Sequence, residues 1–300
     1  MASALFMMIP HGARRAFRRI NEQRMNENDQ ADNSNAQDSN SEASEYKPST
    51  WDVLHVRALL QWRMGVPVEI VDEIIDTAEY WLSTTATMTQ PEKGTHRIIR
   101  KDHDQVLLKT VPLCYDRKQL ERSPDSPRPL PHRSSNHPCR KIVFRLSSHD
   151  QGSGRIHPNM YEHSWTWFDA EIIRGAHAQK MYIDGEERIL LPNEKGETAI
   201  SRESGDPLLL PGADKIQLNG ARVSDTQDVE IVWHYQDDIQ PDSPAASDIE
   251  KAKGRGRATL DGQFVREMQV GDSIAVWARA RFPGWSNHVY RASVTVYWAV

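Results

Sequence analysis

The chain has 300 residues, and its 37 basic and 42 acidic side chains leave a formal net charge of −5. This slightly acidic balance gives no electrostatic reason to expect nucleic acid or an anionic membrane surface as a partner. The two cysteines, Cys114 and Cys139, exclude a disulfide scaffold, and no apolar run reaches the about 20 residues that span a bilayer. We therefore expect free thiols and an intracellular protein, cytoplasmic or nuclear, without a membrane span.

The first 50 residues have two different compositions. Residues 1–25 hold five arginines against one acid, and Ala13, Phe17 and Ile20 recur at helical spacing. This basic amphipathic segment fits a partner-binding helix, a mitochondrial presequence or a frayed terminus, and the sequence leaves these alternatives open. Residues 26–50 are acidic and polar, so we expect a disordered linker that cannot bury enough apolar surface to fold.

Residues 51–88 have the apolar periodicity of helices. A first helix is expected over 51–64, capped by Ser49 or Thr50 and ended by Gly65. Its apolar stripe consists of Trp51, Leu54, Ala58 and Trp62. A second helix opens at Pro67, where the missing N–H costs nothing, and its apolar face continues through Ile70, Ile74 and Ile75. The pattern predicts a helical hairpin with a very short turn.

From about residue 95 the apolar period changes to two, which is typical of strands. The strands expected are 95–100, 105–111, 140–146, 164–173, 180–183, 215–223, 228–235, 273–282 and 288–300. Residues 122–139 and 240–259 are polar and rich in proline or glycine, and we expect them to be mobile loops. The fold class predicted is α+β but mainly β: a helical hairpin over 51–88, then an antiparallel, jelly-roll-like β-sandwich over 89–300.

Two of these strands alternate so that each has one apolar face and one face that mixes tryptophan with charge. The mixed faces carry Trp165, Trp167, Asp169 and Glu171 on one strand, and Trp277, Arg279 and Arg281 on the other. If both belong to one sheet, Asp169 or Glu171 can pair with Arg279 or Arg281 beside the tryptophan rings. Such a face is a candidate recognition surface. The alternative is that loops cover the rings and the ion pairs are structural.

The run His149-Asp150-Gln151-Gly152 follows a predicted strand and is a second candidate binding site. A Ser-His-Asp relay built from these neighbours is excluded, because adjacent residues on an extended chain point in opposite directions. The alternative is a loop whose Asp150 and Gln151 cap backbone N–H groups. The His and Cys spacing matches no zinc pattern, and no phosphate or dinucleotide loop is present, so we expect no metal and no cofactor.

The stretch 66–75 contains Pro67-x-Glu69-Ile70 followed by the apolar pair Ile74-Ile75, and it resembles the opening of an F-box. The resemblance implies that Pro67, Ile70, Ile74 and Ile75 dock on the adaptor subunit of a cullin ubiquitin ligase. It also implies that the C-terminal domain presents a substrate protein.

A second resemblance covers most of the chain from Trp51 onward. It rests on Ala-Glu-Tyr-Trp at 78–81, Ser-His-Asp-Gln-Gly at 148–152, Ser-Trp-Thr-Trp-Phe at 164–168 and Ala-Arg-Ala-Arg-Phe-Pro-Gly-Trp at 278–285. With these motifs the chain resembles a family of uncharacterised fungal proteins. This resemblance implies a shared fold and brings no established activity.

The function predicted first is a non-enzymatic protein-interaction module, an F-box-like substrate adaptor whose sandwich recognises a target. The alternative is a sandwich that binds a glycan or another small ligand through the Trp/Arg face. The third hypothesis is a hydrolase that uses His149 and Asp150. The partners expected are thus a protein, with a ubiquitin-ligase adaptor as the candidate, or a carbohydrate, and not nucleic acid.

Overall fold

The computed structural model divides the chain into two compact units, Met1–Tyr46 and Lys47–Val300, and the second is described here. The described residues are 46–89, 95–101, 103–123, 126–133, 137–152, 160–178, 180–183, 186–189, 199–200 and 215–300. Between 179 and 214 only the backbone of short strands is described. The predicted basic N-terminus over 1–25 and the acidic linker up to residue 45 lie outside these residues.

A helical hairpin opens the second unit. It consists of α3 (Thr50–Ala58), the π-helical turn η1 (Leu59–Arg63) and α4 (Val68–Thr77). Ser49 and Asp52 form a reciprocal capping box that satisfies backbone donors at the start of α3. Gly65 takes a positive φ of 66° in the turn, where a side chain would be strained, and Pro67 precedes the first residue of α4. The capping and turn signals of the sequence therefore act as predicted.

The predicted hairpin boundary at residue 88 is wrong. The helix ends at Thr77, Glu79 turns the backbone with a positive φ of 50°, and residues Leu82–Thr87 form strand β1. This segment is rich in β-branched threonine, and Thr85 meets Thr295 across the strand pair with their hydroxyl oxygens 3.0 Å apart. The strand therefore belongs to the sandwich, and the helical part of the chain is shorter than its apolar pattern indicates.

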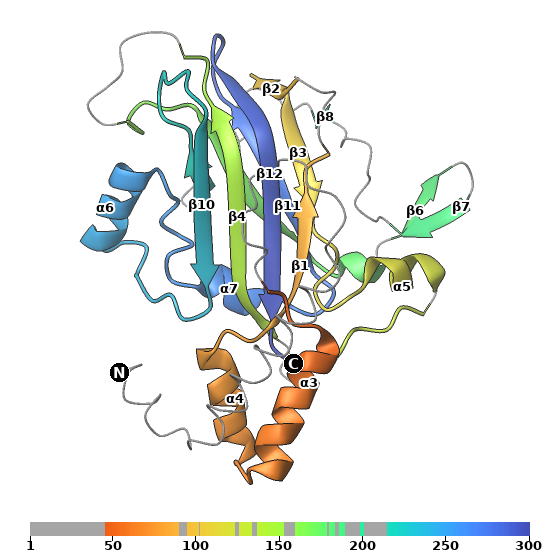
Figure 1. The fold of residues 1–300 in the computed structure, drawn as a ribbon. Coiled ribbons are helices and arrows are strands. Elements are labelled where there is room, and N and C mark those ends of the chain that lie inside the picture. The colour runs from red at the N-terminus through yellow and green to blue at the C-terminus, as the bar shows by residue number, and fades with distance from the viewer. Residues whose placement is uncertain are drawn as a thin grey trace, which may run out of the picture. The chain divides into compact units, whose positions relative to one another are not determined.

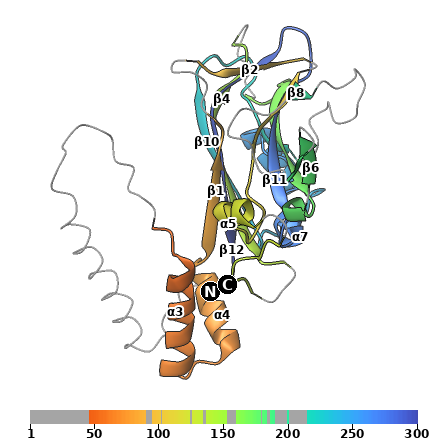
Figure 2. The ribbon, with the colours of Figure 1, turned by 90° about the vertical axis from the view of Figure 1, so that its right-hand side faces the viewer.

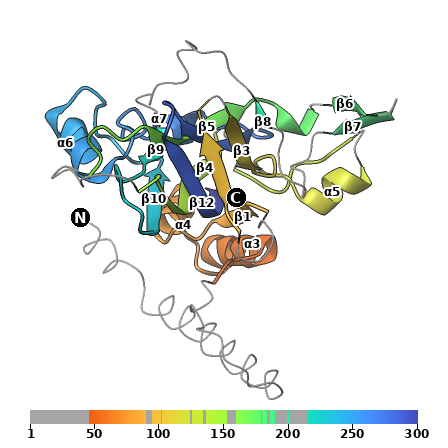
Figure 3. The same cartoon turned by 90° about the horizontal axis from the view of Figure 1, so that it is seen from above.

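Two antiparallel sheets form the sandwich, and they lie as two layers in Figures 2 and 3. The first, sheet A, has the order β1, β12 (Ser286–Trp298), β4 (Cys139–His149), β10 (Gln227–His234), with β2 (Arg97–Arg100) also paired to β12. The second, sheet B, has the order β8 (Ala199–Ile200), β3 (Asp104–Lys109), β11 (Ser273–Ala280), β5 (Thr166–Ile173), β9 (Lys215–Leu218). A separate hairpin pairs β6 (Lys180–Ile183) with β7 (Glu186–Ile189).

The connectivity is that of a jelly roll. Counting β1, β3, β4, β5, β9, β10, β11 and β12 as the first to eighth strands, sheet A has the order 1-8-3-6 and sheet B the order 2-7-4-5. This is two Greek keys wrapped around one core. The predicted fold class, a mainly β sandwich with an N-terminal helical region, is confirmed (Figure 1).

Both segments predicted to be mobile loops contain packed backbone. Residues 240–259 include helix α6 (Pro244–Lys253), which Ser243 caps and Gly254 ends with a positive φ of 69°. In 122–139, the Leu130 N–H donates to the Cys114 carbonyl. Polar composition hid both features, because a short helix with one buried residue leaves little apolar signal. The other helical elements among the described residues are α5 (Arg117–Arg122), η2 (Ala176–Ala178) and α7 (Gln263–Glu267).

The core lies between the sheets and is built from their inward faces. Phe168 of β5 and Val276 of β11 are fully buried there, as the strand alternation predicts. Phe144 and Trp233 of sheet A meet edge to face with ring centroids 4.6 Å apart. Among the described residues, no helix has the length and apolar character needed to cross a membrane.

Candidate functional site

The Trp/Arg face predicted from the strand alternation exists on the outer side of sheet B. Nη1 of Arg279 lies 2.6 Å from Oδ2 of Asp104, and its Nε lies 2.5 Å from Oδ2 of Asp169. The indole N–H of Trp167 also donates to Asp169, at 2.9 Å. The indole of Trp277 donates to Glu171 at 2.7 Å. The predicted pairing of Asp169 with Arg279 is therefore present.

The centre of this face is closed to a ligand. Trp167, Trp277 and Arg279 are buried. Their N–H groups already bond to the carboxylates of Asp169 and Glu171, so they are not available to a ligand. A buried Arg needs such partners, since an uncompensated charge in a dry environment is costly. The geometry thus favours the structural alternative for the central residues.

Only one end of the face has aromatic surface in contact with solvent. Trp165 is half-buried and meets Phe282 edge to face, with ring centroids 4.8 Å apart. The guanidinium of Arg281 lies over the Phe282 ring at 5.6 Å, and Phe282 is 40% exposed. The backbone joins the same residues, because the Arg281 N–H donates to the Trp165 carbonyl. We call these three residues the strand-end cluster.

His149, Asp150 and Gln151 do not form a catalytic group with one another. The carboxylate of Asp150 accepts backbone N–H groups of Gly152 and Arg222, and burial raises its pKa above the ordinary value. Oε1 of Gln151 accepts the Ser286 N–H at 3.3 Å. Asp150 and Gln151 thus cap backbone donors, as the alternative interpretation predicts.

A glycine and a buried asparagine complete this loop. Gly152 has a positive φ of 69°, and a Cβ there would lie 2.4 Å from the Cβ of Ser224, so only glycine fits. Next to it, Asn219 is buried and donates to Asn287 at 2.9 Å and to Thr166 at 3.1 Å. These hydrogen bonds join strands of both sheets. A structural role therefore explains why Asp150, Gln151 and Gly152 stand in this loop.

The helical hairpin carries the most exposed apolar surface of the described residues. Between 61 and 70 every residue except Val66 is exposed. Trp62 is 80% exposed, and Ile70 is 45% exposed. Further exposed apolar side chains of the hairpin are Trp51, Leu54, Met64 and Val68. We call Trp62, Met64, Val68 and Ile70 the hairpin tip. The turn between η1 and α4 points away from the sandwich in Figures 1 and 2.

The four docking residues predicted on α4 divide into two groups. Pro67 and Ile70 are exposed, and Ile74 is half-buried. Ile75 is only 1% exposed, because it packs in a cluster with Val71 and with Trp81, Val143 and Tyr297 of the sandwich. Ile75 is therefore a core residue, and its prediction as a docking residue is wrong. Helical periodicity marks an apolar side chain without telling whether the fold or a partner covers it.

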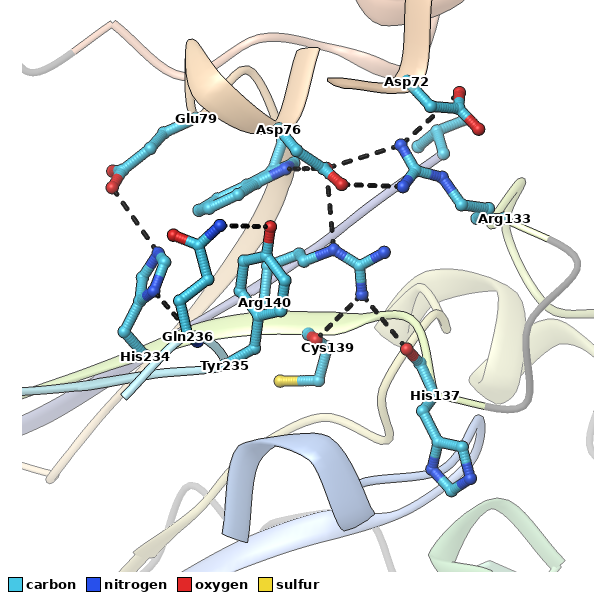
Figure 4. Close-up of polar contacts among 12 residues, drawn as sticks. Asp72, Asp76, Glu79, Arg133, His137, Cys139, Arg140, His234, Tyr235 and Gln236 are labelled. Atoms are coloured by element: carbon cyan, nitrogen blue, oxygen red, sulfur yellow. Dashed lines mark hydrogen bonds and ion pairs between the residues drawn. The ribbon is translucent and has the colours of Figure 1, made fainter. Parts of the chain in front are cut away.

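An ionic network fixes the hairpin to the sandwich, and Asp76 of α4 is its centre (Figure 4). Oδ2 of Asp76 accepts from Nη1 of Arg133 at 2.7 Å. Its Oδ1 accepts the indole N–H of Trp81 at 2.9 Å and lies 3.5 Å from Nε of Arg140. Arg140 also donates to the carbonyl of His137. One carboxylate thus joins the helix to β4 and to the segment that precedes it.

Two further acids extend the network on either side of Asp76. Asp72 pairs with Arg57, which also donates to the carbonyl oxygen of Val300 at 2.9 Å. Glu79 pairs with Lys141, and its Oε1 lies 3.6 Å from Nε2 of His234. Burial is the main reason why the pKa of His234 lies below its ordinary value. At this junction ion pairs and the apolar cluster around Ile75 therefore join the hairpin to the sandwich.

Sequence reasoning missed this junction, although a signal for it existed. Asp72 and Asp76 are four residues apart, which places two acids on one stripe of α4, and Glu79 follows just past the end of the helix at Thr77. A stripe of acids beside an apolar face indicates a basic surface nearby. Its arginines come from the polar loop and strand around residues 133–140, so no local pattern could identify them.

No family model matches the chain, and none of the curated proteins matches it. A solved structure of deformed wing virus carrying the GFP gene aligns over 84% of this chain and 91% of that chain, with 8% sequence identity and a TM-score of 0.16. At that score the alignment supports no conclusion about fold or function.

Proposed function

We propose that this protein is an interaction protein whose hairpin tip docks a partner protein. The observation that carries the proposal is the exposure of Trp62, Met64, Val68 and Ile70 on the hairpin. Contiguous exposed apolar surface is unusual on a soluble fold and marks interaction sites. Tryptophan in particular contributes a large share of the binding free energy at protein interfaces.

The ionic junction supports this role. Because Asp76 and Asp72 hold α4 against the sandwich, the tip is presented in one orientation before a partner arrives. A preorganised surface pays less ordering entropy on binding, and this raises its affinity. Glu69 and Glu73 are exposed on the same helix, so a fitting partner has an apolar groove with basic side chains at its rim.

The partner we propose is the adaptor subunit of a cullin ubiquitin ligase. The support is the F-box-like stretch 66–75, of which Pro67 and Ile70 are exposed at the tip. In this proposal the sandwich presents the target protein at a distance from the tip. The stretch is short, and the chain enters β1 at Leu82, so the hairpin alone has to provide the docking surface.

Titration calorimetry of the full chain with purified adaptor subunit tests the proposal. Trp62→Ala and Ile70→Asp should each weaken binding by about 30-fold, which corresponds to about 2 kcal/mol for an interface anchor. Met160→Ala is the matched control, because Met160 is an exposed apolar residue of the sandwich, and it should leave the affinity unchanged. Absence of binding by the wild-type chain would exclude the adaptor as partner. Equal affinities of all variants would exclude the tip as the docking surface.

A second candidate function is the binding of a glycan or another small ligand at the strand-end cluster. The observation in its favour is the accessible Trp165–Phe282 pair with Arg281 beside it. An aromatic face stacks on the apolar side of a sugar ring, and a guanidinium donates to its hydroxyl groups. A glycan array probed with the full chain and with Trp165→Ala tests this function. Signals that persist in the variant would exclude the cluster as the binding site.

A further inference from the structure

Three histidines gather on the outer face of sheet A, where β2 pairs with β12 and β4 ends. Figure 1 shows β2 at the end of the sheet away from the hairpin. On β12, Asn287 and Val289 point into the core and are fully buried, so Ser286 and His288 face outward. His288 lies between two neighbouring strands, opposite Ile98 of β2 and His149 of β4. His96 precedes β2 and completes the group.

Hydrogen bonds connect Ser286, His288 and His96 in a chain. The Ser286 Oγ lies 2.8 Å from Nε2 of His288, and Nδ1 of His288 lies 2.8 Å from Nε2 of His96. In the tautomer with its proton on Nδ1, His288 donates to His96 and accepts the hydroxyl proton of Ser286 at Nε2. This is the order of groups that activates a serine: a nucleophile, a base, and a third group that orients the base.

Neighbouring groups hold the His288 ring in place and keep it neutral. The ring of His149 stacks on it, with centroids 4.6 Å apart and an angle of 11° between the planes. Burial lowers the pKa of His288 to about 4, with further lowering from the positive charges of His149, His96 and Arg100. Tyr290 is a further titratable group beside the cluster: its ring stacks on His96, and its hydroxyl oxygen lies 3.1 Å from Nε2 of His149. At neutral pH His288 is therefore unprotonated, and its Nε2 can accept the Ser286 proton.

The cluster is not arranged as a metal site. His96 and His288 bond directly to each other through the nitrogens that would have to hold an ion. Consistent with this, the described part of the chain contains no group of three or more His, Cys, Asp or Glu that could hold a metal.

We propose that Ser286 is the nucleophile of an ester-cleaving site, with His288 as its general base and His96 as a positioning residue. The substrate class follows from the neighbours on the same sheet face. Arg100 is exposed and lies directly opposite Ser286 in the strand pair, and Ile98 is exposed opposite His288. Adjacent side chains of a strand pair are about 5 Å apart at Cβ, so both reach a bound ester. The site fits an acyl ester with a short apolar part and an anionic group.

The reaction proceeds in two balanced halves. The Ser286 Oγ attacks the ester carbonyl carbon while His288 Nε2 takes the hydroxyl proton, and the carbonyl electron pair moves to its oxygen. When that pair returns, the bond to the alcohol oxygen breaks, and the alcohol leaves with the proton from His288. Water then attacks the acyl-serine, gives a proton to His288, and the acid leaves as Ser286 recovers that proton. The sum is ester and water converted to acid and alcohol.

A fluorophosphonate reagent applied to the full chain tests whether Ser286 is activated. Mass spectrometry of the digested protein should find one phosphonate on the peptide that contains Ser286, and Ser286→Ala should abolish this labelling. Ser293→Ala is the matched control, because Ser293 lies on the same strand, faces outward, and has no histidine opposite it in the strand pairs. It should label as fast as the wild-type chain.

Two histidine variants separate the proposed roles. His288→Gln should slow labelling at least 10-fold, because the base is lost. His96→Gln should slow labelling less, because the amide oxygen can still accept from Nδ1 of His288. It should also move the inflection of the rate against pH upward, because His96 lowers the pKa of His288. With native thermal melting of each variant as the folding control, labelling that misses Ser286 or that stays fast in His288→Gln would overturn the proposal. The enzyme-catalysed rate above background should fall more in Arg100→Ala for 4-nitrophenyl hydrogen succinate than for the butyrate ester, and equal losses would exclude the role of Arg100.

Discussion

Replacing Asp76 tests whether the ionic junction holds the hairpin on the sandwich. In Asp76→Ala the buried indole N–H of Trp81 loses its acceptor at 2.9 Å, and Arg133 loses its partner at 2.7 Å. A buried donor left without its partner costs about 1–3 kcal/mol. The Asp76 and Arg133 side chains are 15% and 19% exposed, so solvent screens their pairing only in part, and we add about 1 kcal/mol. The expected loss in the free energy of unfolding is about 2–4 kcal/mol.

Two companion variants make this estimate specific. Asp76→Asn keeps an oxygen acceptor for Trp81 and removes only the charge, so it should cost about half as much. Asp228→Ala breaks an ion pair between two exposed side chains, Asp228 at 69% and Arg291 at 68%. It should lower the free energy of unfolding by no more than about 1 kcal/mol.

Urea unfolding followed by tryptophan fluorescence and circular dichroism gives the three free energies. The order expected is Asp76→Ala as the least stable, then Asp76→Asn, then Asp228→Ala. If Asp76→Ala loses no more stability than Asp228→Ala, the junction does not hold the hairpin, and the argument for a preorganised tip fails with it.

Three further predictions concern the loop, the histidine cluster and the thiols. Gly152→Ala should lower the free energy of unfolding by about 2 kcal/mol or more in urea titrations, because a Cβ there meets Ser224 at a positive φ, and an unchanged midpoint would contradict this. The pKa of His288 is about 4 in the folded protein and 6.5 ordinarily, so between these values the unfolded chain binds more protons. The free energy of unfolding should therefore fall as the pH falls from 6.5 to 4. His288→Gln should flatten this dependence, and an unaltered slope would show that other groups cause it. Cys114 and Cys139 are buried, and burial raises the pKa of both thiols. A thiol reagent should therefore label them only after unfolding. Rapid labelling of the native protein would refute their burial.

The candidate sites show where sequence reasoning reaches its limit. Strand alternation placed Asp169 and Arg279 on one face, and they do pair, because registers are set by which side of each strand is apolar. The same alternation could not tell that Trp167 and Trp277 are buried, since both faces of a central strand can be covered. The hydrogen-bonded group of Ser286, His288 and His96 was missed for a different reason. Ser286 and His288 are two residues apart, but His96 lies beside them only because β2 pairs with β12.

The sequence by itself determined the start of the helical hairpin, the strand-rich remainder and the inward faces of β5 and β11, because these follow from local capping signals and from periods of 3.6 and 2 residues. The tertiary structure alone decided that residues 82–87 leave the helical region for sheet A, that Ile75 is core while Ile70 is surface, and that Asp76 meets two arginines of a polar loop and strand. The physical reason is that burial and ion pairing depend on which distant segments the fold brings together. A local apolar or charged pattern indicates that a side chain needs a packing or ionic partner, but it does not indicate which distant segment provides it.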